Sequence, residues 1–91
     1  MGFRHVVLLT LDDACDVDAV VAALRELPAA IPELRAYDVA RDAGLVDGNA
    51  TLSVVADFDD EQGWRTYTDH PAHQQIIQDK IRPHLKDRAA A

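Results

Sequence analysis

The chain has 91 residues, of which 48% are hydrophobic and 27% are charged, and its formal net charge is −7. This composition is typical of a globular protein, and so short a chain can build only one hydrophobic core. The acidic balance disfavours nucleic acid as a partner, and no apolar run approaches the ~18 residues that a membrane span needs. The lone Cys15 cannot form an internal disulfide, which agrees with a cytoplasmic location.

The first third of the chain predicts a strand followed by a helix. Residues 3–11 are apolar on both faces and rich in β-branched side chains, which predicts a strand buried on both sides. Three aspartates between residues 12 and 16 then complement the positive end of a helix dipole. Apolar residues recur at helical spacing from Val17 to Leu27, and Pro28 is expected to end this helix.

The remaining two thirds predict a hairpin and then a helical region in two pieces. Extended segments at 34–41 and 51–58 flank a turn-rich stretch, so they are expected to pair with each other. A helix is expected from about residue 59 to 68, and Pro71 is well placed to begin another that runs to Arg82. The order βαββα is most of a ferredoxin-like α+β unit.

A ferredoxin-like unit also needs a fourth strand, and the sequence offers little for it. Residues 85–88 contain one leucine and three charged residues, and three alanines follow. Alanine is depleted in strands, so we expect a fourth strand that is either short or cut off after residue 88. One edge of the sheet would then be open, which favours a partner that covers it.

Three stretches are similar to the stress-responsive A/B-barrel (Dabb) family. They are Phe3 to Leu8, Val55 to Phe58 followed by acidic residues, and the most specific one, a Tyr-x-x-His-Pro-x-His signature from Tyr67 to His73. The similarity extends from about residue 3 to 84, and it implies that residues 1–91 form a single Dabb-type domain. It also implies a homodimer whose two sheets face each other and form an α/β barrel, with the helices outside.

The resemblance further implies site residues and a chemistry. Some members are olivetolic acid cyclase-like polyketide cyclases, whose catalytic tyrosine and histidine correspond to Tyr67 and His73. Their early-strand histidine corresponds to His5, and we expect it to line a small apolar ligand cavity together with Val7 and Leu9. A histidine base and a tyrosine donor suit the aldol or Claisen ring closure of a polyketide-like ligand without a cofactor.

Other interpretations of the same residues stay open. Tyr67 and His73 could instead close the helix break by hydrogen bonding, in a non-catalytic stress-response or structural dimer. A cofactor-free monooxygenase is a second alternative, because another family of dimeric α/β barrels performs that reaction. His5 could be a satisfied core histidine, and His70 is expected to cap a helix. These histidines lack a full set of neighbouring ligands, so we expect no metal site.

Overall fold

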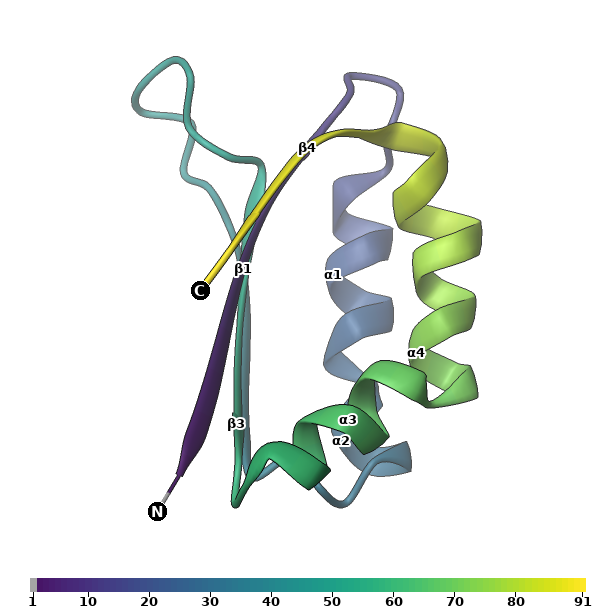
Figure 1. The fold of residues 1–91 in the computed structure, drawn as a ribbon. Helices are drawn as coiled ribbons and strands as arrows, with labels where there is room; N and C mark the ends of the chain where they lie inside the picture. The colour runs from purple at the N-terminus through teal and green to yellow at the C-terminus, as the bar shows by residue number, and fades with distance from the viewer. Residues whose placement is uncertain (1) are drawn as a thin grey trace.

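The computed structural model describes residues 2–91 and contains one antiparallel sheet with helices on a single face (Figure 1). The strands are β1 (Phe3–Leu11), β2 (Ala36–Arg41), β3 (Leu52–Phe58) and β4 (Leu85–Ala90), in the order β2-β3-β1-β4. The helices are α1 (Val17–Arg25), α2 (Leu27–Ala30), α3 (Glu61–Asp69) and α4 (Pro71–Ile76). A π-helical turn η1 (Ile77–Ile81) and a 3-10 turn η2 (Arg82–His84) continue α4. The ferredoxin-like α+β fold is confirmed.

Side-chain caps explain where the longer helices begin. Asp16 and Asp60 each accept a hydrogen bond from a backbone N–H in the first turn of α1 and α3, at 3.1 and 3.0 Å. At α4 the ring Nδ1 of His70 takes this role and accepts from the Ala72 N–H at 3.1 Å. Pro71 follows this cap in the first turn, where its missing N–H costs nothing. His70 is therefore the helix cap that the sequence predicted.

Two segments differ from the sequence-based expectation. β4 does not stop by residue 88 but runs to Ala90, and Ala91 still exchanges two backbone hydrogen bonds with Val6, both 2.9 Å long. Pairing with β1 thus outweighs the low strand propensity of alanine. Pro28 does not end the first helical region, because it lies in the first turn of the short α2.

The hydrophobic core lies between the sheet and the helices. Strand alternation directs Val7 and Leu9 of β1 toward this layer, and α1 packs its apolar stripe against it. The largest side chains that are almost fully buried are Phe58, Leu24, Ile31, Leu52, Val20 and Val39. This rigid layer fixes the side chains that line the cavity described below.

The opposite face of the sheet carries no helix (Figure 1). β1 presents Val6 and Leu8 on this open face, with Val55 of β3 beside Val6 in the register. Leu8 is 43% exposed, so one chain buries only one face of the strand that the sequence predicted to be buried on both. The loop between β2 and β3 projects toward the helix-free side and carries Leu45 and Val46, which are 86% and 64% exposed. Burial of these side chains would require a further surface.

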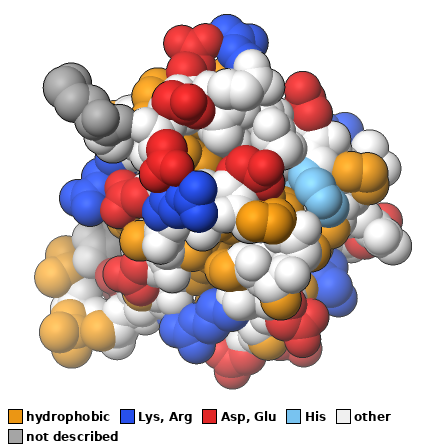
Figure 2. Space-filling view, turned by 90° about the horizontal axis from the view of Figure 1, so that it is seen from below, with side chains coloured by type: hydrophobic (Ala, Val, Ile, Leu, Met, Phe, Trp, Pro, Cys, Tyr) orange, Lys and Arg blue, Asp and Glu red, His pale blue; other side chains and the backbone are white. Residues whose placement is uncertain are grey.

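Charged side chains of both signs are interspersed on the surface. On the face seen in Figure 2, acidic side chains separate the basic ones, which form no continuous stripe. Several arginines pair with carboxylates of other elements at 2.7 to 2.9 Å: Arg4 with Asp57, Arg35 with Asp59, and Arg41 with Asp18. No helix between residues 2 and 91 is long and apolar enough to cross a bilayer.

Candidate functional site

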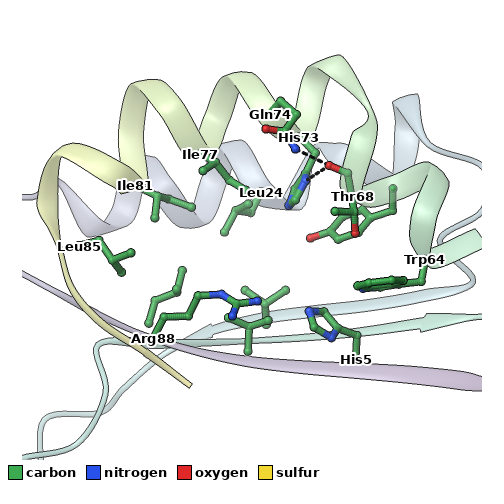
Figure 3. Close-up of a pocket in the computed structure, with 14 residues that line it drawn as sticks. His5, Leu24, Trp64, Thr68, His73, Gln74, Ile77, Ile81, Leu85 and Arg88 are labelled. Carbon is green, nitrogen blue, oxygen red and sulfur yellow. Dashed lines mark hydrogen bonds between the residues drawn. The ribbon is translucent and has the colours of Figure 1, made fainter. Parts of the chain in front are cut away.

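A cavity of about 200 Å³ lies between the helix-facing side of the sheet and the α3, α4 and η1 segments (Figure 3). Most of its wall is apolar, and only a few polar groups reach it. His5, Val7, Leu9, Tyr67 and His73 all line it, so the structure brings together every residue that the sequence singled out for a site. A concave, mainly apolar wall with few polar groups is typical of a small-molecule site.

The break between α3 and α4 directs His73 into this cavity. The carbonyl of Thr68, near the end of α3, accepts side-chain hydrogen bonds from His73 Nδ1 at 3.3 Å and Gln74 Nε2 at 2.6 Å. A carbonyl oxygen can only accept, so Nδ1 of the neutral imidazole carries the proton. The other ring nitrogen, Nε2 of His73, therefore keeps its lone pair and can accept a proton.

Burial keeps the His73 ring neutral. The side chain is only 9% exposed, and this desolvation lowers the pKa of the imidazole because it disfavours the charged form. The bond to the Thr68 carbonyl opposes this effect, whereas His5 and His70 lower the pKa further. His73 is thus a buried base rather than an imidazolium.

Tyr67 packs directly beside His73. Their ring centroids are 4.1 Å apart with an interplanar angle of 36°. The Tyr67 hydroxyl lies 3.0 Å from that of Tyr37 on β2. Burial raises the pKa of both phenols, although the bond to Tyr37 lowers that of Tyr67 in part. When Tyr37 donates in this pair, the proton of Tyr67 is free for a ligand.

His5 and Trp64 form the end of the cavity near α3. Their ring centroids are 5.8 Å apart, and Trp64 also packs against Phe3 at 6.0 Å. Burial and the charge of Arg88 lower the pKa of His5. The imidazole of His5 forms no hydrogen bond with any other residue of the range 2–91, so the ring lines the cavity without a fixed polar partner. The buried Nε1 of Trp64 likewise has no partner in that range.

Several polar residues of the cavity wall were not expected from the sequence: Thr68, Gln74, Trp64 and the charged Arg88. Leu9 faces the helices and Arg88 pairs with it in the sheet, so both side chains point to the same side. The alternation of β4 would have shown this, but residues 85–90 were not expected to form a full strand. Arg88 was therefore left out of the predicted site.

The described residues offer no evident metal site. Between residues 2 and 91, no three His, Cys, Asp or Glu side chains are grouped as metal ligands. Of the two histidines in the signature, His70 uses its Nδ1 as a helix cap and only His73 lines the cavity. The ring and hydroxyl groups of His5, Tyr67 and His73 at the cavity wall can donate or accept protons.

Comparisons with known proteins agree with this architecture. A dimeric ferredoxin-like protein of unknown function from Thermobifida fusca is 46% identical, over 100% of this chain and 88% of that chain, with a TM-score of 0.87. A Dabb family protein from Mesorhizobium loti is 20% identical, over 99% of this chain and 92% of that chain, with a TM-score of 0.80. Hydroxynitrile lyase from Passiflora edulis shares the fold at 14% identity, over 99% of this chain and 89% of that chain, with a TM-score of 0.82.

A search of the curated proteins gives no match. The model of the stress responsive A/B barrel domain matches residues 3–91, which includes all four strands and every cavity residue described above. Together with the Thermobifida relative, this match settles the family. The chain belongs to the stress responsive A/B barrel domain (Dabb) family.

Proposed function

We propose that the chain forms a homodimer and that each cavity binds a small, mainly apolar carbonyl compound, from which His73 removes a proton. The observation that carries this proposal is the packing of a neutral, buried His73 against Tyr67 on the wall of an apolar cavity. A polyketide-like ligand activated in this way would close a ring, as the cyclases of the family do. No resident cofactor is needed for such a step.

Each residue has a defined task in this step. Nε2 of His73 takes the proton from a carbon next to a carbonyl, and the electron pair of that C–H bond moves to form an enolate. The Thr68 carbonyl, which accepts from Nδ1, stabilises the imidazolium that forms. The Tyr67 hydroxyl donates to the enolate oxygen, and the Tyr37 hydroxyl supports that orientation by donating to Tyr67.

The open sheet face supports the homodimer. Val6, Leu8 and Val55 lie on this face, and the 46% identical Thermobifida relative is described as dimeric. A second copy placed face to face would bury these side chains and leave the helices outside. The hydroxynitrile lyase from Passiflora edulis is an example of an enzyme with this fold, and it gives no information on the reaction of this chain.

A non-catalytic dimer is the second candidate, because the same hydrogen bonds also have a structural use. The bonds from His73 and Gln74 to Thr68 satisfy a carbonyl at a helix end. The pair of Tyr37 and Tyr67 ties α3 to β2. A test of catalysis must therefore separate proton transfer from folding.

The test is the rate of deuterium exchange at the methylene between the two carbonyls of heptane-2,4-dione in D2O, measured by NMR. We expect the wild-type protein to accelerate exchange above the buffer rate, and His73→Gln to reduce the acceleration by about 100-fold or more, as for loss of a general base. Gln keeps an N–H donor for the Thr68 carbonyl, so folding is preserved. His70→Asn is the matched control, because Asn keeps the cap and position 70 lies outside the cavity. It should alter the exchange rate only through a rise in the pKa of His73, which His70 lowers.

Two results would contradict catalysis. The first is a wild-type protein that leaves exchange at the buffer rate, and the second is a folded His73→Gln variant that is as fast as wild type. Either result would favour the non-catalytic dimer.

A further inference from the structure

Arg88 is the one permanently charged side chain among the residues that line the cavity. The cavity contains no Asp or Glu, although the chain has 16 acidic and 9 basic residues. Arg88 forms no ion pair or hydrogen bond within residues 2–91, whereas Arg4, Arg35, Arg41 and Arg65 each pair with a carboxylate. A lone guanidinium thus faces a space that is otherwise apolar or neutral.

The sheet register fixes the direction of this side chain. Arg88 lies opposite Leu9 on the helix-facing side, and in Figure 3 its guanidinium extends into the cavity toward His5. His5 is four residues before Leu9 on β1, which corresponds to about 13 Å along the strand. The long side chain of Arg88 covers part of this distance, and its positive charge helps to lower the pKa of His5.

An unpaired guanidinium beside an apolar space attracts an anion. The planar fork of arginine matches the two oxygens of a carboxylate. Arg88 is itself exposed, so it can receive an anion from solvent at the edge of the apolar wall. The volume of about 200 Å³ limits the apolar part of the ligand, since a cavity of ~150 Å³ accommodates one benzene ring. A small molecule with one anionic end fits both constraints.

We infer that the ligand of this cavity is a small oxo acid whose carboxylate binds Arg88 while its apolar body lies over Val7 and Leu9. Its carbonyl would then lie toward His73 and Tyr67, on the helix side of the cavity. This inference rests on the proposed function, because it names the substrate class of the same site.

Hexanoate and hexanamide form a probe pair that differs in charge and hardly in size. Their affinities are measured by NMR titration at neutral pH and low salt. We expect wild type to bind hexanoate about tenfold more tightly or better, since a hydrogen bond between charged groups is worth more than a neutral one. Arg88→Gln is expected to bind both probes with the affinity of hexanamide, and Arg88→Lys to keep part of the preference.

Arg82→Gln is the matched control, because Arg82 is exposed like Arg88 and carries the same charge but lies outside the cavity. It is expected to keep the full preference for hexanoate. Equal affinities for the two probes in wild type, or a preference that survives in Arg88→Gln, would overturn the inference alone. If neither probe binds, the ligand cavity of the proposed function fails with it. If hexanoate is preferred through Arg88 but His73 does not promote exchange, only the proton transfer fails.

Discussion

The imidazole of His73 connects chemistry and stability at the scale of a single residue. Its Nδ1 is held by the Thr68 carbonyl, so its Nε2 is the atom left for a ligand. The same burial that keeps the ring neutral makes its protonation unfavourable in the folded state. A proton taken from a ligand is therefore held for a short time, and the ring returns readily to its basic form.

Acid should destabilise the fold through this residue. The pKa of His73 is lowered from 6.5 on folding, so the unfolded chain binds more protons below about that pH. The stability that the neutral His73 ring contributes to the fold is fully present above pH 6.5 and is lost as the pH falls to the pKa of the folded state. We expect the free energy of unfolding in urea to drop between pH 7.5 and pH 5, and to drop less in His73→Gln.

Two other groups, His5 and Asp57, also have pKa values that shift on folding and could contribute to the same pH dependence. The pKa of His5 is also lowered on folding, so His73→Gln should keep part of the pH dependence. The pKa of Asp57 is lowered by its bond with Arg4, but from 3.8, and that contribution is lost only at more acid pH. Identical pH profiles for wild type and His73→Gln would show that the ring titrates normally.

At the scale of elements, the first three strands and the helices other than the short α2 could be predicted from hydrophobic periodicity and turn residues. Tyr67 and His73 of the signature both line the cavity, and their role there stays a prediction. The full extent of β4 could not be predicted, because alanine has a low strand propensity and these alanines form a strand by pairing with β1. Arg88 was therefore not predicted as a cavity residue, since the face to which a side chain points follows from the strand that carries it.

The hydrogen bonds between β4 and β1 can be tested with proline. Val6 and Ala91 exchange hydrogen bonds, so in an antiparallel ladder the N–H of Ala89 also points to β1 and that of Ala90 points away. We expect Ala89→Pro to lower the free energy of unfolding by about 1–2 kcal/mol and to weaken the preference for hexanoate. Ala90→Pro should change both much less, and equal losses in urea unfolding would contradict this register.

At the scale of the whole molecule, the sheet has two faces with different roles. The helix-covered face contains the cavity, whose wall is formed by the sheet and by α1, α3, α4 and η1. The open face contains Val6, Leu8 and Val55 but no cavity residue. Pairing of two chains and binding of a ligand should therefore be separable by mutation.

Sedimentation of an open-face variant tests this separation. Wild type is expected to sediment at twice the 10.0 kDa of one chain, and Leu8→Glu at the mass of one chain, because a charge would be buried without a partner at the centre of the interface. Ala22→Glu, on the exposed side of α1, should leave the dimer intact. A wild-type mass of one chain would refute the dimer. Because Leu8 lies on the face of β1 opposite to Val7 and Leu9, a monomeric Leu8→Glu that remains folded should still prefer hexanoate over hexanamide. Loss of that preference would show instead that the partner shapes the site through the sheet.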